Sequence, residues 1–394
     1  RGLGDVYKRQ VEISCHGSIY IQQQIISLLL RAGCRLAQPG EFTRRAFTNG
    51  KLDLSQAEAV ADLIASTSAA SHRLAMQQMR GGFSRELILL REKLLTFASL
   101  VELELDFSEE EVEFADREKL TDLASEIERV IKRLSDSFTL GNAIKNGVPT
   151  AIIGETNAGK STLLNRLVKE DKAIVSDIHG TTRDVIEDTV VLQGITFRFI
   201  DTAGIRETHD AIENMGIERT FQKLDQAHIV IWLIDATGST QDIEKIAGRV
   251  LPHCTDKRLI VAFNKVDKIE SATQQQLTDL YKRLTREKPN TSFIFLSASH
   301  DQNIDVLEKQ LADTIQSTQT GENDIIVTNV RHYEALLNAH DAILRTLNGL
   351  QSGLSGDFLA QDIRECMHYL GEITGQISTD EILGTIFSKF CIGK

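Results

Sequence analysis

The stretch that most constrains this chain is residues 154–161, which read Gly-Glu-Thr-Asn-Ala-Gly-Lys-Ser. They fit the pattern G-x-x-x-x-G-K-[ST] of a phosphate-binding loop. The apolar run 148–153 predicts a buried strand before the loop, and residues 162–167 predict a helix after it. In that setting successive backbone N–H groups form a concave anion site, helped by the positive end of the helix. Lys160 would reach the outer phosphates of a nucleotide, and the Ser161 hydroxyl would coordinate Mg²⁺.

Two further segments of nucleotide-binding type follow in the expected order. Residues 180–184, Gly-Thr-Thr-Arg-Asp, lie where a switch segment should be, so that Thr182 would give Mg²⁺ a second hydroxyl. Residues 201–204, Asp-Thr-Ala-Gly, end a predicted strand. Asp201 would hold Mg²⁺ through water, and the Gly204 N–H would sense the γ-phosphate.

The choice of base depends on residues 264–267, Asn-Lys-Val-Asp, which follow the predicted strand 259–263. The Asp267 carboxylate can accept two hydrogen bonds, from N1–H and the exocyclic amine of guanine. Adenine has no matching donor pair, so ATP would leave this carboxylate unpaired. Residues 297–299, Ser-Ala-Ser, would back the guanine from the other side. The sequence therefore predicts GTP binding.

The residues expected to contact GTP are Asn157, Ala158, Gly159, Lys160, Ser161, Thr162, Ser176, Thr181, Thr182, Asp201, Thr202, Ala203, Gly204, Asn264, Lys265, Asp267, Ser297, Ala298 and Ser299.

The motifs do not directly identify the residue that orients the attacking water. Many such switches carry a glutamine directly after Asp-x-x-Gly, but here that position is Ile205. Glu213 lies a few residues downstream and is the candidate to position the water. From the residues alone, a solvated glutamate in a switch segment is an open alternative.

Composition limits the remaining classes. The chain has 394 residues, enough for two or three domains, with 41% hydrophobic and 25% charged residues. A net charge of −12 disfavours a general basic nucleic-acid binder but leaves room for a local basic groove. The five cysteines are far apart and form no C-x-x-C, so neither a disulfide framework nor a zinc site is indicated and a cytoplasmic location is expected. No run of 18 apolar residues indicates a membrane span.

The order of the predicted helices and strands along the chain indicates several domains. Strands are expected at 11–15 and 34–37 around a helix at 19–32, and helical periodicity is found from about 52 to 138 and again from 330 to 390. Between them, short apolar runs alternate with helical stretches, which predicts an α/β domain with a parallel sheet and helices on both faces, inserted into a discontinuous helical domain. The expected divisions are a non-native stretch 1–10, an N-terminal α+β remnant 11–50, a first helical half 51–145, the α/β domain 146–318 and a second helical half 319–394.

These features together resemble the MnmE (TrmE) family of tRNA wobble-uridine modification GTPases. The resemblance rests on the nucleotide motifs, on residues 39–47 and 51–59, and on the terminal Phe-Cys-Ile-Gly-Lys of 390–394. It implies a homodimer that works with the FAD-dependent MnmG in a heterotetramer to place an aminomethyl or carboxymethylaminomethyl group on carbon 5 of the tRNA wobble uridine. It also implies that the N-terminal remnant binds 5-formyltetrahydrofolate or a related folate and forms the constitutive dimer, and that the first portion of this domain is missing here.

The resemblance assigns roles by position. A K⁺ site would use Asn157, Ser176, Ile178 and Thr181, where K⁺ would offset charge that develops in the transition state. Glu213 matches the catalytic acid that positions water.

The resemblance also assigns residues to tRNA modification and folate binding. Cys391 matches an essential C-terminal cysteine that could act as nucleophile or acid, although from sequence alone a cysteine beside Phe390 is more often a buried apolar residue. Glu12, Lys51 and Lys394 match folate contacts, with surface charges as the alternative for each.

Two other functions fit parts of the sequence. A ribosome-assembly GTPase of the Era type shares the GTP motifs, but no GXXG loop with basic flanks is found here, and the helical halves with Cys391 stay unexplained. A non-enzymatic nucleotide switch that only scaffolds partners would also bind GTP, and it would not need Cys391.

Overall fold

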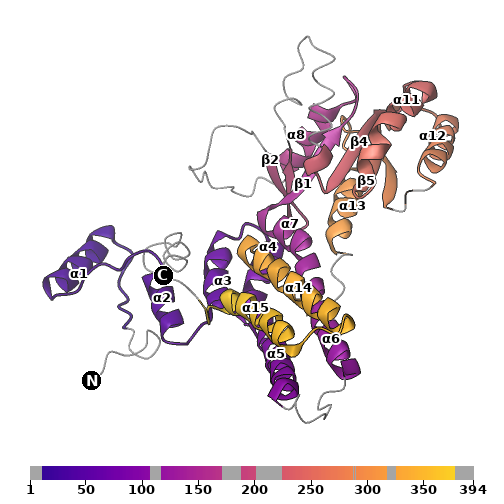
Figure 1. The fold of residues 1–394 in the computed structure, drawn as a ribbon. Helices are drawn as coiled ribbons and strands as arrows, with labels where there is room; N and C mark the ends of the chain where they lie inside the picture. The colour runs from indigo at the N-terminus through magenta and orange to yellow at the C-terminus, as the bar shows by residue number, and fades with distance from the viewer. Residues whose placement is uncertain are drawn as a thin grey trace. The chain divides into compact units, whose positions relative to one another are not determined.

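The computed structural model describes residues 11–106, 117–170, 188–200, 224–286, 288, 290–316 and 325–377. The chain divides into two compact units (Figure 1). One consists of Arg1–Ser66, His72–Gly141 and Ile325–Lys394, and the other of Thr67–Ser71 and Asn142–Asp324. The second unit is inserted into the first, in agreement with the predicted fold class.

The N-terminal part of the first unit contains helices α1 (Ile19–Arg31) and α2 (Glu41–Thr48). Helix α1 confirms the helix predicted at 19–32. The strands predicted at 11–15 and 34–37 are wrong, because these residues have no regular structure. A strand needs a neighbour for its backbone hydrogen bonds, and the described part of this unit offers no sheet to join.

Four long helices form the core of the first unit as a bundle: α5 (Gly82–Asp106), α6 (Arg117–Asp136), α14 (Val330–Gln351) and α15 (Gly356–Thr374). Apolar side chains at three- and four-residue spacing turn inward from each helix, and fully buried examples are Leu94, Ile127, Ile343 and Ile363. Helices from both ends of the sequence therefore share one core. The helical periodicity predicted from the sequence is confirmed as far as α15.

Two shorter helices, α3 (Leu54–Ala65) and α4 (Ala69–Met79), precede the bundle. Helix α3 begins with a capping box, in which Asp53 accepts from the Gln56 backbone N–H at 2.9 Å and Gln56 accepts from that of Asp53 at 3.0 Å. On the inner side of α3, Glu58 is buried and ion-paired with Arg331 and His332 of α14.

We predict that this buried carboxylate makes the bundle sensitive to acid. Ionic contacts with His332 and Arg331 outweigh the opposing effect of burial and lower the pKa of Glu58 from 4.5 to about 2. A lowered folded-state pKa stabilises the protein above about pH 4.5, and this stability is lost as the pH falls towards 2. The Glu58→Gln variant should therefore be less stable than wild type by about 3 kcal/mol at pH 7.

Urea unfolding of the helical unit at pH 7 and at pH 3 measures this effect. The difference in unfolding free energy between wild type and Glu58→Gln should shrink at the lower pH. A difference that is the same at both pH values would contradict the prediction.

The second unit is built on a six-stranded sheet in the order β2-β3-β1-β4-β5-β6. All neighbours are parallel except β2 and β3, which form an antiparallel hairpin at one edge. The parallel sheet predicted from the sequence is confirmed, with β2 as an exception. The strands are β1 (Val148–Ile153), β2 (Asp188–Leu192), β3 (Ile195–Phe199), β4 (Ile229–Asp235), β5 (Arg258–Asn264) and β6 (Thr291–Phe295).

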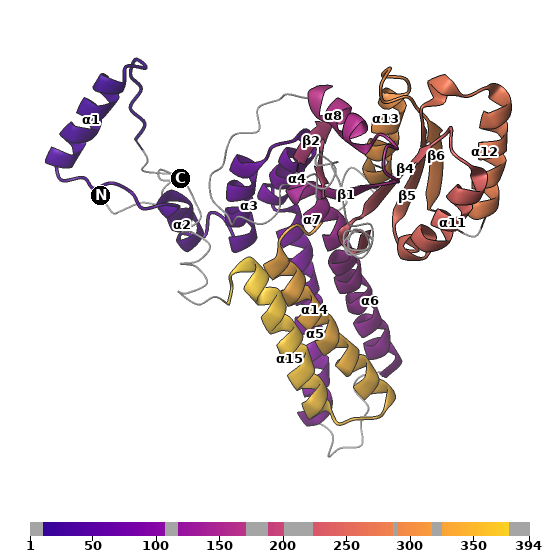
Figure 2. The same ribbon diagram turned by 90° about the horizontal axis from the view of Figure 1, so that it is seen from above.

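Helices cover both faces of this sheet (Figure 2). On one face, alternate residues such as Val230, Trp232 and Val261 pack with α11 (Thr240–Val250) and α12 (Ser271–Leu284). The residues between them point to the other face. That face is covered by α8 (Lys160–Glu170) and α13 (Ile304–Gln316), whose leucine side chains are buried.

The remaining elements are α7 (Phe138–Asn146), which leads into β1, and two 3₁₀ turns, η2 (Leu251–Cys254) and η3 (Val266–Lys268). Within the described ranges, no helix is both long and apolar enough to span a membrane.

Candidate nucleotide site

The loop between β1 and α8 has the backbone that phosphate binding requires. A Cβ on Gly154 would lie 2.2 Å from the Leu233 carbonyl oxygen, and one on Gly159 would lie 2.3 Å from Asn264 Nδ2. Gly159 also has φ +99°, a conformation that L-residues with side chains rarely adopt. Only glycine fits these two positions, so the backbone N–H groups of the loop stay accessible at the start of α8.

Lys160, the first residue of α8, folds back over the loop. Its Nζ donates to the carbonyl oxygens of Gly154 and Glu155, both at 2.7 Å. Burial lowers the pKa of Lys160, and the nearby Glu155 carboxylate opposes this shift. The ammonium group is therefore held at the mouth of the loop, where phosphate oxygens can replace the two carbonyl oxygens.

The buried side chain of Asn264 joins the phosphate loop to the loop after β6. Its Nδ2 donates to the Ala158 carbonyl at 2.7 Å, and its Oδ1 accepts from the Ala298 N–H at 3.0 Å. Asn264 ends β5 and is only 3% exposed. One amide thus holds both loops at fixed positions on the carboxyl edge of the sheet, where open α/β sheets bind ligands.

Asp267, predicted to recognise guanine, is held by the loop after β6. The Ser297 hydroxyl donates to Asp267 Oδ1 at 2.5 Å, and this hydrogen bond lowers the pKa of Asp267. His300 Nδ1 lies 3.6 Å from Asp267 Oδ2. An ionised carboxylate can only accept, which is what the two adjacent N–H donors of guanine need.

Lys265 is positioned by a residue that the sequence analysis missed. Its backbone has φ +66°, and its Nζ contacts Asp235 Oδ2 at 2.5 Å. Asp235 ends β4, and its other oxygen accepts from the N–H and hydroxyl of Thr237 at 3.0 and 2.7 Å. An acidic residue at the carboxyl end of a strand next to β5 was the available signal.

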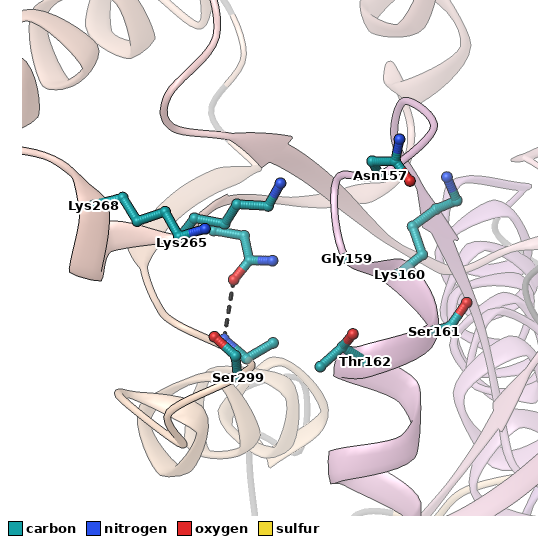
Figure 3. Close-up of a pocket in the computed structure, with 10 residues that line it drawn as sticks. Asn157, Gly159, Lys160, Ser161, Thr162, Lys265, Lys268 and Ser299 are labelled. Carbon is teal, nitrogen blue, oxygen red and sulfur yellow. Dashed lines mark hydrogen bonds between the residues drawn. The ribbon is translucent and has the colours of Figure 1, made fainter.

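These parts surround a cavity of about 400 Å³. In Figure 3, Asn157 and Lys160 lie on the phosphate-loop side, and Lys265, Lys268 and Ser299 lie across from them. Lys268 was not predicted to be a site residue, although it directly follows the guanine motif. The cavity is lined by Asn157, Gly159, Lys160, Ser161, Thr162, Asn264, Lys265, Lys268, Ala298 and Ser299.

The structure does not bear on every predicted site residue. Glu12 and Lys51 are exposed. The others lie outside the described residues: Ser176, Ile178, Thr181, Thr182, Asp201, Thr202, Ala203, Gly204, Glu213, Cys391 and Lys394.

The Asp235–Lys265 contact leads to a prediction about GTP affinity. In Asp235→Asn the ion pair with Lys265 is lost and only a neutral amide oxygen can still accept from Lys265 Nζ, so Lys265 is held less firmly at the cavity. We expect KM for GTP to rise about tenfold, equivalent to about 1.4 kcal/mol, with kcat within about twofold. Steady-state GTP hydrolysis measures both constants.

Asp242→Asn on α11 is the matched control, since Asp242 is exposed and contacts only Lys245 among the described residues. It should leave both constants unchanged. An unaltered KM in Asp235→Asn would show that Lys265 does not need its partner.

Comparison with known proteins finds matches that cover almost the whole chain. The family model described as "MnmE helical domain" matches residues 54–391, and that described as "GTP-binding protein TrmE N-terminus" matches residues 7–51. The second match begins at residue 7, within the stretch 1–10 that the sequence analysis expected to be non-native.

Curated relatives match over nearly the full chain. The tRNA modification GTPase MnmE of Bacteroides thetaiotaomicron is 63% identical over 97% of this chain and 82% of its own length. The protein of the same name from Flavobacterium johnsoniae is 54% identical over 98% of this chain and 82% of its own length. A solved GTP-binding protein from Sulfolobus solfataricus in complex with GDP has 18% identity and a TM-score of 0.34, over 58% of this chain and 68% of its own, which is too low to bear on function.

The geometry of the phosphate loop and this near-complete match agree, and the chain belongs to the MnmE family of tRNA modification GTPases.

Proposed function

We propose that this GTP hydrolase is stimulated by K⁺ and that, with the FAD-dependent MnmG, it installs an aminomethyl or carboxymethylaminomethyl group on carbon 5 of the tRNA wobble uridine. The observation that carries the proposal is the cavity in which Asn157 and Lys160 face Lys265 across the site. Family membership adds the link to tRNA. We place the reaction in the cytoplasm.

The residues around the cavity fit GTP with Mg²⁺. The glycine backbone leaves room for phosphates, Lys160 supplies positive charge, and the hydroxyl of Ser161, in the first turn of α8, lines the same cavity. Mg²⁺ neutralises phosphate charge when it is bound. Thr182 would be its second protein ligand, with Asp201 acting through water, and Glu213 would orient the attacking water. These three roles are proposals from position in the sequence.

K⁺ stimulation is proposed because of Asn157. Its side chain lines the cavity on the same side as Lys160 (Figure 3), and its backbone has φ +66°. An amide oxygen at this place can bind a monovalent cation, and Ser176, Ile178 and Thr181 would complete the site. A cation there can offset negative charge in the transition state.

We expect GTP hydrolysis to be several-fold faster in K⁺ than in Na⁺ at equal ionic strength, by about tenfold if the cation replaces one charge-stabilising group. In Asn157→Lys the two salts should give equal rates, because the ammonium group takes the place of the cation. Equal rates of the wild-type protein in K⁺ and Na⁺ would contradict the proposed site.

The tRNA step is assigned to Cys391, which we propose acts as nucleophile or acid at the modifying centre. Glu12, Lys51 and Lys394 are proposed folate contacts, and the N-terminal part is proposed to form a homodimer that assembles with MnmG into a heterotetramer. The test is modification of tRNA by the protein with MnmG, GTP and a folate one-carbon donor. Cys391→Ser should hydrolyse GTP normally but leave the wobble uridine unmodified, and full modification by this variant would contradict the assignment.

An Era-type ribosome-assembly GTPase and a non-enzymatic switch were the alternatives. The match of the helical family model to residues 54–391 disfavours both, because it covers the parts that neither alternative explains.

A further inference from the structure

The loop after β6 is held by an arginine to which the sequence analysis gave no role. We call residues 297–303 the base loop, because Ala298 and Ser299 line the cavity and Ser299 lies across it from the phosphate loop (Figure 3). Arg166 on α8 contacts the base loop twice. Its Nη1 lies 2.8 Å from Asp301 Oδ2, and its Nη2 donates to the Ser299 carbonyl at 3.4 Å. Arg166 is not among the residues that line the cavity, so its action is on the loop.

The base loop is a closed turn. Ser297 and Gln302 exchange two backbone hydrogen bonds, both at 3.1 Å, which brings the two ends of the turn together. Asp301 lies within the turn and has φ +54°, in the left-handed region. The end of the loop is tied to the sheet, since Asn303 Nδ2 donates to the Phe295 carbonyl at 2.7 Å. The tip of the turn needs contacts of its own to keep a fixed position beside the nucleotide.

Those contacts come from the sheet and from α8. Asn264, at the end of β5, accepts from the Ala298 N–H at 3.0 Å. Arg166 holds Ser299 and Asp301. A planar guanidinium group can bind a carboxylate and a carbonyl oxygen at the same time in a fixed geometry, which the single ammonium group of lysine does not reproduce.

The helix that carries Arg166 also carries residues of the phosphate side. Helix α8 begins at Lys160, and Ser161 and Thr162 in its first turn line the cavity (Figure 3). Arg166 lies about 9 Å further along the helix axis than Lys160. One continuous helix therefore connects the phosphate side of the cavity to the base loop.

We infer that Arg166 is a positioning residue for nucleotide binding, which keeps the base loop closed on guanine and slows release of the nucleotide. The inference rests on the proposed placement of guanine between Asp267 and the base loop. It adds a residue beyond the phosphate-loop motif, which ends at Ser161.

The exposure of the pair separates this role from a role in folding. The side chains of Arg166 and Asp301 are 37% and 43% exposed, and ion pairs this exposed contribute little to stability. A loop that contacts the base binds the ground state and the transition state equally, so its displacement should change KM and not kcat. The expected signature is weaker binding by a protein of unchanged stability.

The test measures the Kd and the release rate of radiolabelled GDP, together with steady-state GTP hydrolysis, in the full chain. The variants are Arg166→Gln, Asp301→Asn and the protein with both changes. Asparagine tolerates the left-handed backbone of position 301, so Asp301→Asn removes the charge without straining the turn. Arg283→Gln is the matched control, because Arg283 on α12 forms an exposed ion pair with Glu244 on α11 in the same unit.

Each single variant should raise the Kd for GDP and the KM for GTP about fivefold, with kcat within about twofold and an unchanged melting temperature. The double variant should bind no more weakly than either single variant, because both changes remove the same interaction. Arg283→Gln should match wild type in every constant.

The inference is overturned if Arg166→Gln binds GDP and hydrolyses GTP with wild-type constants. It is also overturned if the two single effects multiply in the double variant, since Arg166 would then act independently of the base loop. Failure of the guanine placement itself is read separately, from an unchanged nucleotide preference of Asp267→Asn.

Discussion

Replacing Lys160 by methionine is expected to lower kcat/KM for GTP by about a thousandfold. The ammonium group lies at the mouth of the phosphate loop, where it donates to two carbonyl oxygens at 2.7 Å. Burial lowers its pKa, because the partly buried ammonium group has lost part of its hydration. A fixed charge aimed at the phosphates contributes about 3 to 4 kcal/mol to stabilisation of the transition state.

The measurement is steady-state hydrolysis with Lys245→Met as the control. Lys245 is an exposed lysine on α11 of the same unit, and its loss should change the rate by less than about twofold. Circular dichroism would show that both variants are folded. A Lys160→Met protein with more than about a tenth of the wild-type kcat/KM would exclude the phosphate loop as the catalytic site.

Changing Asp267 to asparagine should reverse the base preference. The carboxylate offers two acceptors to the N1–H and amine of guanine, whereas asparagine offers one acceptor and a donor that opposes the amine. We expect affinity for GTP to fall on the order of a thousandfold. Xanthosine triphosphate carries a carbonyl in place of the amine, so Asp267→Asn should bind it more tightly than GTP.

Two features keep this prediction specific. The Ser297 hydroxyl, now 2.5 Å from Asp267 Oδ1, can still donate to an asparagine oxygen, so the loops keep their positions. Asp279→Asn on α12 changes an exposed aspartate nearby in sequence and should leave nucleotide preference unaltered. Unchanged discrimination between the two nucleotides in Asp267→Asn would show that another residue reads the base.

The parts of the site that the sequence predicted are those set by local chemistry. The glycines at 154 and 159 are required by the close approach of Leu233 and Asn264, and the spacing of the loop motif expresses this requirement directly. The order of strands, loops and helices around them follows from short apolar runs with polar ends. Most of the described residues predicted to contact GTP line the cavity, whereas Ala158, Asp267 and Ser297 are not among the residues that line it.

The parts that the sequence did not predict depend on partners far along the chain. Alternation at 11–15 predicted a strand, but a strand forms only where a neighbour accepts its hydrogen bonds, and Val11 and Ile13 remain 82% and 56% exposed. The ion pair of Glu58 with Arg331 joins residues 273 positions apart, so no periodicity could indicate it. Asp235 was missed because its role depends on the pairing of β4 with β5.

The antiparallel hairpin of β2 and β3 at the edge of the sheet was not predicted from the sequence, because it depends on the conformation of a two-residue turn. The strands β2 and β3 are joined at Gln193 and Gly194, which have φ +49° and +79°. Two successive positive φ values are typical of the tight turns that connect antiparallel strands. This turn explains why one strand of an otherwise parallel sheet runs the other way.

The most direct test of the account is competition for nucleotide hydrolysis by the purified protein. The substrate is trace GTP in the presence of Mg²⁺ and K⁺, and the competitor is ATP at about a hundred times the KM for GTP. The rate of GTP hydrolysis should stay within about twofold of the rate without ATP, because adenine has no donor pair for Asp267. The same excess of unlabelled GTP should suppress turnover of the trace almost completely. Suppression by ATP equal to that by GTP would contradict the claim that this cavity selects guanine and with it the assigned site.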